Sequence, residues 1–193
     1  IIMKKMILIT GGAGYIATHT LIELKKANFD FVVYDNFSNS SKEALKRVKK
    51  ITGAKIKFVK GDIRDKKALR KVFKTYSIDS VIHFAGLKAV GESVAKPLKY
   101  YDNNVVGTIK LLEVMREFDC KKIVFSSSAT VYGNPKSCPI DESFDVGATT
   151  NPYGTSKYMI ERILEDLYLS DNSFKIAILR YFNPVGAHES GLI

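Results

Sequence analysis

The sequence predicts an α/β fold, a doubly wound parallel sheet with helices on both faces, on three observations. Short apolar, β-branched runs alternate with amphipathic stretches along the whole chain, without internal repeats or low-complexity linkers. Capping residues and prolines mark where the amphipathic stretches begin. The 193 residues, 46% of them hydrophobic, suffice for one sizeable core but would be cramped as two domains. A single domain over residues 1–193 is therefore expected.

The expected strands are short runs rich in β-branched and aromatic residues. In chain order they are Met6–Thr10, Phe31–Asp35, Lys55–Lys60, Ser80–Phe84, Lys122–Ser127 and Lys175–Tyr181. Right-handed crossovers through the intervening helices make such strands parallel, and ligands then bind beyond the carboxyl ends of the strands.

The expected helices are supported by their end signals. Ser40 or Ser41 can cap a helix that Gly53 ends, and Asp65 can cap the next one. Two longer helical patterns follow prolines, which the first turn of a helix tolerates. These patterns are Leu98–Phe118 after Pro97 and Tyr153–Leu169 after Pro152.

Composition argues against several classes of protein. Apolar runs such as Met6–Ile9 are far shorter than the ~20 residues of a membrane span. No apolar segment with a small-residue cleavage site follows the start, so a cytoplasmic location is expected. Cys120 and Cys138 form no CxxC pattern and no histidine has metal-ligand spacing, so neither a zinc site nor a disulfide is expected. Both cysteines are interpreted as packing residues.

The net charge of +10 raises the alternative of nucleic-acid binding. The lysines, however, are spread over helical surfaces at 42–50 and 66–74, without interleaved aromatic residues for base stacking. A solvated basic face is the favoured interpretation, with some general attraction for anionic nucleotides.

A glycine-rich segment, Thr10-Gly11-Gly12-Ala13-Gly14-Tyr15-Ile16-Ala17, follows the first expected strand and opens the first helix. Glycines allow the backbone to approach a pyrophosphate, whose charge would lie at the N-terminus of the helix. Asp35 ends the second strand, about where the dinucleotide-binding (Rossmann) fingerprint places an acid. A carboxylate there accepts a ribose 2′-hydroxyl and repels a 2′-phosphate, which favours NAD over NADP. An ordinary turn at Asp35-Asn36 is the alternative.

Two further strand ends carry candidate cofactor contacts. Gly61-Asp62-Ile63 ends the third strand, where Asp62 can accept a hydrogen bond from an adenine amino group. Phe84-Ala85-Gly86 ends the fourth, where small residues let a cofactor lie against the backbone. Each segment alone is compatible with an ordinary turn, and their order along the chain favours cofactor binding.

A candidate reacting set follows the fifth strand. Ser128 lies in the segment Ser126-Ser127-Ser128-Ala129-Thr130, and Tyr153 and Lys157 are at i and i+4 on one helix face. A phenol with a pKa of ~10 needs nearby positive charge to ionise near neutrality, and Lys157 supplies one such charge. The set predicts hydride transfer at an alcohol carbon. Ser128 would bind the reacting oxygen, Tyr153 would exchange its proton, and Lys157 would position the nicotinamide ribose and tune the phenol.

The three histidines indicate no competing site. His83 lies in the apolar fourth strand and is interpreted as a hydrogen-bonded core or near-cofactor residue, while His19 and His188 are far apart in the sequence. No metal is expected.

Nearly the whole chain resembles the extended short-chain dehydrogenase/reductase family and, within it, the UDP-glucose 4-epimerase (UDP-galactose 4-epimerase) family. The resemblance is carried by residues 10–16, 81–93, 100–105, 126–133 and 179–187. It implies bound NAD, oxidation of the sugar 4′-hydroxyl, rotation of the 4-keto sugar and return of hydride to its other face. UDP-glucose and UDP-galactose would interconvert in this way, as galactose metabolism requires.

The resemblance also implies a role for individual residues. The implied catalytic residues are Ser128 and Tyr153 with Lys157 as their partner, and the implied substrate contacts are Ser128, Thr130, Tyr153 and Asn183. The implied NAD contacts are Gly11, Gly14, Tyr15, Ile16, Asp35, Asn36, Asp62, Ile63, Phe84, Ala85, Lys88, Asn103, Ser126, Tyr153, Lys157, Tyr181 and Phe182.

Two features qualify what the resemblance implies. Sugar-nucleotide dehydratases of the family have an Asp-Glu pair after the position of Ser128, whereas this chain has Ala129-Thr130, so dehydration is not expected. Family members are roughly twice as long, with a C-terminal half that clamps the uridine diphosphate. We therefore expect NAD binding with a low epimerase rate. Dimerisation through the two longest helices is implied by the resemblance alone.

Two alternatives stay open. One is a different UDP-sugar 4-epimerase, acting on an N-acetylhexosamine or a glucuronate. The other is a non-catalytic NAD-binding module, against which the complete set of Ser128, Tyr153 and Lys157 argues.

Overall fold

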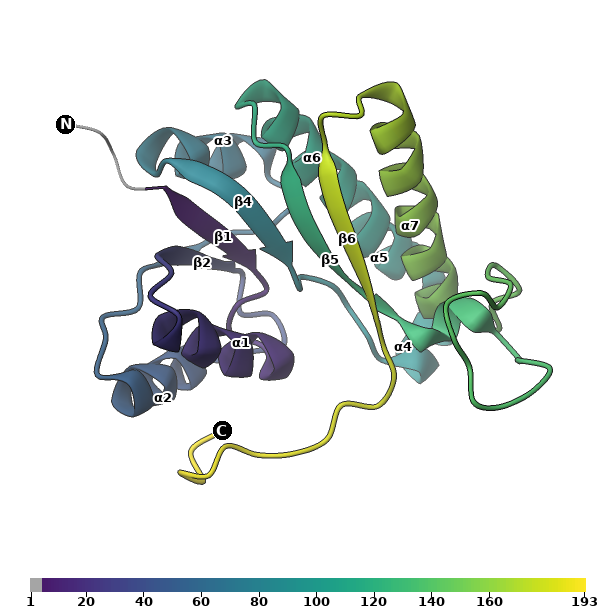
Figure 1. Ribbon diagram of the computed structural model, residues 1–193, viewed down its shortest axis with the longest axis horizontal. Coiled ribbons are helices and arrows are strands. Elements are labelled where there is room, and N and C mark those ends of the chain that lie inside the picture. The colour runs from purple at the N-terminus through teal and green to yellow at the C-terminus, as the bar shows by residue number, and fades with distance from the viewer. Residues whose placement is uncertain (1–4) are drawn as a thin grey trace.

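A computed structural model describes residues 5–193 as a six-stranded sheet flanked by helices (Figure 1). All strands are parallel, in the order β3-β2-β1-β4-β5-β6. This order reverses between β1 and β4, where a crevice forms at the carboxyl ends of the strands. The predicted doubly wound fold is confirmed. The strands are β1 (Met6–Thr10), β2 (Phe31–Asp35), β3 (Phe58–Lys60), β4 (Ile78–His83), β5 (Lys122–Ser128) and β6 (Lys175–Tyr181).

Helices lie on both faces of the sheet. On one face are α1 (Tyr15–Lys26) and α2 (Lys42–Thr52), and on the other are α3 (Lys66–Thr75), α6 (Gly107–Glu117) and α7 (Pro152–Ser170) (Figure 1). Two short helices, α4 (Val90–Ala95) and α5 (Pro97–Tyr100), follow β4. Successive strand residues enter opposite cores, as Leu8 packs in one cluster and Ile9 in the other.

The helix ends follow the expected capping chemistry. Ser41, and not Ser40, caps α2 by accepting from the Glu43 N–H, and Gly53 ends that helix at a φ of +66°. The Asp65 carboxylate caps α3 by accepting from two backbone N–H groups. The Asn151 side chain caps α7 by accepting a hydrogen bond from the Gly154 N–H.

Several predicted boundaries are wrong. β3 begins at Phe58 and not at Lys55, because its pairing with β2 starts at the Val33–Phe58 pair. β4 begins at Ile78, which pairs with Met6 across a register irregularity. The predicted helix Leu98–Phe118 divides into α5, a π-helical segment at Tyr101–Val106, and α6. The short helix α4 was not predicted.

The cysteines differ from each other. Cys120 is a buried thiol in the core, and burial raises its pKa to about 11. Cys138 is an exposed thiol in the segment between β5 and α7, so the interpretation of this residue as a packing residue is wrong. Among residues 5–193 no helix has the length and apolar character to cross a membrane.

Candidate active site

A cavity of about 470 Å³ lies at the carboxyl ends of the strands. It is bordered by the glycine-rich segment, the ends of β2, β4 and β5, the start of α7 and the residues after β6. The fold thus brings together nearly all the site residues predicted from the sequence. Those lining the cavity are Gly11, Gly14, Tyr15, Ile16, Asp35, Asn36, Ile63, Phe84, Ala85, Lys88, Asn103, Ser126, Ser128, Thr130, Tyr153, Lys157, Tyr181, Phe182 and Asn183.

The glycine-rich turn lies close against the end of β4. Gly11 has a φ of +65°, and a Cβ there would lie 2.6 Å from Ala85 N, so a side chain would clash with backbone. α1 begins after Gly14 with no side-chain hydrogen bond to its first turn. Its first N–H groups are therefore available to an anion, as a pyrophosphate site requires.

Asp35 holds this turn from the end of β2. Its Oδ2 accepts from Ala13 N at 3.0 Å. Its Oδ1 accepts from Phe37 N at 2.8 Å and from the Ser40 hydroxyl at 2.9 Å. Because each carboxylate oxygen has about two acceptor positions, Oδ2 keeps one for a ligand hydroxyl.

The polar loop after β2 was not predicted as part of the site. Ser38, Asn39 and Ser40 line the cavity beside Asp35. The sequence does contain a signal for this loop, a run of three small polar residues shortly after Asp35. Such a run is also typical of a helix cap, which is how it was interpreted.

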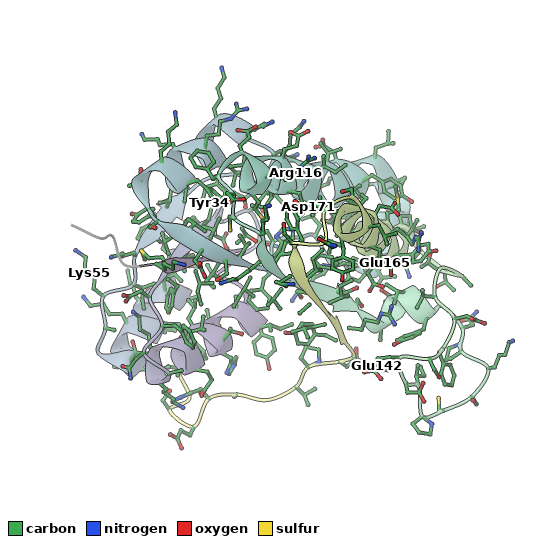
Figure 2. The ribbon with its side chains drawn as sticks, turned by 45° about the horizontal axis from the view of Figure 1, so that its top comes forward. Tyr34, Lys55, Arg116, Glu142, Glu165 and Asp171 are labelled. Atoms are coloured by element: carbon green, nitrogen blue, oxygen red, sulfur yellow. The ribbon has the colours of Figure 1, made fainter. Side chains whose placement is uncertain are left out.

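Asp62 is the predicted contact that does not line the cavity. Its carboxylate accepts from the backbone and guanidinium of Arg64 and from the Asn36 amide, which uses its acceptor positions. These hydrogen bonds, of which the one from the Arg64 side chain has the largest effect, hold the pKa of Asp62 well below its usual range. Its backbone carbonyl accepts from the hydroxyl of Tyr34, which Figure 2 labels in the interior of the fold. In this structure the Asp62 carboxylate shapes the third strand end, and its contact with an adenine amino group stays a prediction.

The reacting set converges between β5 and α7. Lys157 is 5% exposed, and its Nζ donates to Ser126 O at 2.6 Å. Nζ also lies 4.8 Å from the centroid of the Phe125 ring and 6.0 Å from that of Tyr153. The Ser128 Oγ accepts from the Thr130 N–H and hydroxyl.

Burial shifts both titrating groups of the set. It lowers the pKa of Lys157 to about 8, against the attraction of Glu161, which raises it. It raises the pKa of Tyr153, against a hydrogen bond with Ser128, which lowers it. The phenol is therefore protonated at neutral pH in the chain by itself, and its ionisation requires more positive charge than Lys157 supplies.

The family described as the NAD dependent epimerase/dehydratase family matches residues 7–192. The chain belongs to this family. It is 60% identical over 187 residues to the UDP-glucose 4-epimerase of Pasteurella multocida (strain Pm70), covering 97% of this chain and 55% of that protein. The corresponding enzyme of Bacillus subtilis (strain 168) is 59% identical with the same coverage. The chain spans about half the length of the curated relatives that it matches.

Solved structures agree with this family assignment. The crystal structure of UDP-glucose 4-epimerase from Bifidobacterium longum in complex with NAD+ and UDP superposes with a TM-score of 0.96 at 59% identity. It covers 97% of this chain and 56% of that one. A UDP-Glc/GlcNAc 4-epimerase from Campylobacter jejuni superposes with a TM-score of 0.86 at 38% identity, over 93% of this chain and 54% of that one.

In this family member a buried hydrogen-bond chain joins the glycine-rich turn to the helices behind it. The Thr108 hydroxyl donates to Asn104 O, so it accepts from His83 Nε2–H, and His83 Nδ1 in turn accepts from the Thr10 hydroxyl. His83 is fully buried, and burial lowers its pKa to about 3. Its interpretation as a hydrogen-bonded core histidine is confirmed.

The Asn104 side chain continues the chain toward α7. Its Nδ2 donates to Leu87 O and to the Ser156 Oγ, and its Oδ1 accepts from Leu87 N. Ser156 donates to Tyr153 O. The loop after β4 and the first turn of α7 are thus held together by side chains that the sequence did not single out.

A second buried network lies behind the set. Glu161 is 1% exposed and pairs with Arg180, with Nη2 to Oε2 at 2.9 Å, and also accepts from the Ser127 hydroxyl. Neither charged residue was predicted as part of the site. Among residues 5–193 no three His, Cys, Asp or Glu side chains gather as a metal site would need.

Proposed function

We propose that this chain is the NAD-binding part of a UDP-glucose 4-epimerase, which interconverts UDP-glucose and UDP-galactose through a 4-keto sugar. The observation that carries the proposal is the convergence of Ser128, Tyr153 and Lys157 on the cavity that the glycine-rich turn borders. Residues from three separate segments meet at the one place where the fold favours a dinucleotide. The identity of 59–60% to enzymes named UDP-glucose 4-epimerase supports the choice of substrate.

The residues present fit NAD. The glycine-rich turn can lie against the end of β4 because Gly11 has no Cβ, the first turn of α1 is uncapped, and Asp35 keeps one acceptor position. The negative charge of Asp35 disfavours a 2′-phosphate, so the fit is to NAD and not to NADP. When bound, NAD supplies the acceptor and donor of hydride.

The protein residues manage the proton and the sugar. Tyr153 would take the proton of the sugar 4′-hydroxyl and return it, while Ser128 holds the reacting oxygen by a hydrogen bond. Lys157 keeps a positive charge next to the phenol and has two N–H donors beyond the one that Ser126 O uses. Tyr181 and Phe182 would border nicotinamide and sugar, and Thr130 and Asn183 would contact the substrate; all four line the cavity.

The residues after Ser128 support epimerisation over dehydration. Elimination of water needs an additional acid and base next to the reacting carbon. This chain has Ala129 and Thr130 there, and the Thr130 hydroxyl is bonded to Ser128. Because the sugar takes back the hydride that it gives up, the proposed epimerisation has no net oxidation or reduction.

The extent of the chain bears on the rate. It covers 55% of its Pasteurella multocida relative, so we propose that it keeps NAD affinity but turns over far more slowly than a complete enzyme. A homodimer through α6 and α7 and a cytoplasmic location stay predictions. Exposed Leu98 and Met159, on α5 and α7, are apolar surface available for pairing.

The test is proton NMR of UDP-galactose incubated with the chain and NAD, beside a Tyr153→Phe control. UDP-glucose should form only with Tyr153 present, and calorimetry should show that both proteins bind NAD. Parallel tubes with UDP-N-acetylglucosamine and UDP-glucuronate distinguish the other 4-epimerases. NAD binding without conversion of any sugar would favour a non-catalytic module or a cofactor half, and no NAD binding would refute the proposal.

A further inference from the structure

The ion pair of buried Glu161 and partly buried Arg180 connects four elements behind the reacting set. Glu161 lies on α7, Ser127 on β5 and Arg180 on β6, and the Glu161 carboxylate accepts from both other side chains. Arg180 Nη1 also donates to the Tyr132 hydroxyl at 3.0 Å, in the short helical turn after β5. Hydrogen bonds to Glu161 and then to Tyr132 use three of the five guanidinium N–H donors, and they raise the pKa of Arg180 above the ordinary range.

Stability alone gives little reason for such a pair. Two charges removed from water lose hydration, and well-packed apolar residues of similar size often stabilise a core as well or better. The side chains of Glu161 and Arg180 are 2% and 20% exposed, so the loss is large on the carboxylate side. Stability therefore does not account for the pair.

Lys157 is the group on which this charge acts. Tyr153, Lys157 and Glu161 follow one another at intervals of four residues, so they share one face of α7. The ammonium is buried, and its recorded protein hydrogen bond is the one to Ser126 O.

The surroundings of Lys157 contain few charges. The titratable groups that face it are Tyr153 and Glu161 on α7, Lys88 in the loop after β4, and neutral His83 on β4. Phe125 on β5 presents only its ring, and Arg180 on β6 is bound to Glu161. Glu161 is the one negative group among them.

We propose that Glu161 is a positioning residue for Lys157. Held by Ser127 and Arg180, its carboxylate fixes the middle of α7 against the ends of β5 and β6, and it supplies the buried negative charge that keeps Lys157 an ammonium. The benefit to catalysis rests on the proposed function, whereas the effect on Lys157 does not.

The titration of Lys157 reports this role in the chain without any ligand. Burial lowers the pKa of Lys157 to about 8, and Glu161 opposes that shift. At pH 7 a pKa of about 8 leaves about ten ammonium groups for each amine, and a further fall of about one unit removes that excess. If Glu161 had no charge, the positive charge of Arg180 would also be left unbalanced near Lys157.

The experiment is a pH titration by NMR of the chain labelled with ¹³C at lysine Cε, in which Lys157→Met identifies the signal. We expect Glu161→Gln to shift the Lys157 titration at least one pH unit lower, a tenfold change in its protonation equilibrium. Ser127→Ala is the matched control, because it removes one hydrogen bond to Glu161 and keeps the charge. Its Lys157 should titrate within about 0.3 units of the wild type.

Two further variants separate the charge from the fold. Glu161→Gln combined with Arg180→Met removes both charges of the pair, leaves no unpaired guanidinium, and should still shift the titration of Lys157 to lower pH. Glu161→Asp keeps the charge and should restore most of the wild-type titration. An unchanged Lys157 in either folded Gln variant overturns the proposal, and so does failure of both to fold, because the pair would then be purely structural. NAD calorimetry on the wild type tests the proposed function separately.

Discussion

Gly11 and Gly53 form a natural pair for testing how the cavity is shaped. Both have a left-handed φ, +65° and +66°. A Cβ on Gly11 would lie 2.6 to 2.8 Å from backbone atoms of Ala85 and Phe84, whereas nothing lies within 4 Å of one on Gly53. Alanine at each position therefore separates the cost of the backbone conformation from the cost of close approach to β4.

The expected magnitudes differ accordingly. Gly53→Ala should cost about 1–2 kcal/mol of unfolding free energy, the cost of a left-handed φ for an L-residue. Gly11→Ala should cost that amount plus about 1–3 kcal/mol for the overlap, because backbone atoms cannot rotate away as side chains do. Displacement of the turn should also weaken NAD binding at least tenfold, about 1.4 kcal/mol, while Gly53→Ala leaves it unchanged.

Urea unfolding followed by circular dichroism gives the two free energies, and calorimetry gives the NAD affinities. Equal destabilisation by the two substitutions would show that the approach of Gly11 to β4 adds no constraint. Unchanged NAD affinity in Gly11→Ala would show that this approach does not shape the binding cavity.

Three other predictions follow from single side chains. The pKa of His83 is about 3 in the folded chain and 6.5 for a histidine free in water. Below pH 6.5 the unfolded chain therefore binds a proton that the folded chain does not, and the free energy of unfolding falls. Urea unfolding should show a loss of about 1.4 kcal/mol between pH 7.5 and 5.5 that His83→Asn lacks. Asp35→Ser should reduce the preference for NAD over NADP at least tenfold, because the charge that repels a 2′-phosphate is lost. Calorimetry with both cofactors measures the ratio of the two affinities, and an unchanged ratio would contradict the prediction. Arg64→Gln should cost less than about 1 kcal/mol in urea unfolding, although Arg64 bridges Asp62 and Asp102, because its side chain is 42% exposed.

Much of the fold is local in origin and was predictable. β1, β2 and β6 have the predicted bounds, because each is a short run rich in β-branched and aromatic residues that ends within two residues of a turn-forming Gly, Asn or Pro. Most of the site was predictable for a topological reason: parallel strands bring all their carboxyl ends to one edge, so motifs that end different strands meet there.

The remainder depends on contacts between distant residues. The alternating Lys55-Ile56-Lys57 resembles a strand, yet it finds no ladder partner before Phe58. The hydrogen bonds that Arg64, two residues along, donates to the Asp62 carboxylate were not predicted. The pairing of Glu161 with Arg180 has no sequence signal, because charged residues on a helix and at a strand end read as surface.

The π-helical segment Tyr101–Val106 decides where an extra residue is accommodated in the helix that continues as α6. A π turn holds about one residue more than an α turn, so a helix that lost one residue there could continue as regular α-helix. Residues on the two sides of that loss would keep their relative orientation, because about five residues of π-helix turn through about the same angle as about four residues of α-helix. The same loss within α6 would rotate the residues beyond it by about 100°. The extra residue is thus confined to the neighbourhood of Asn104, whose side chain bonds to both Leu87 and Ser156.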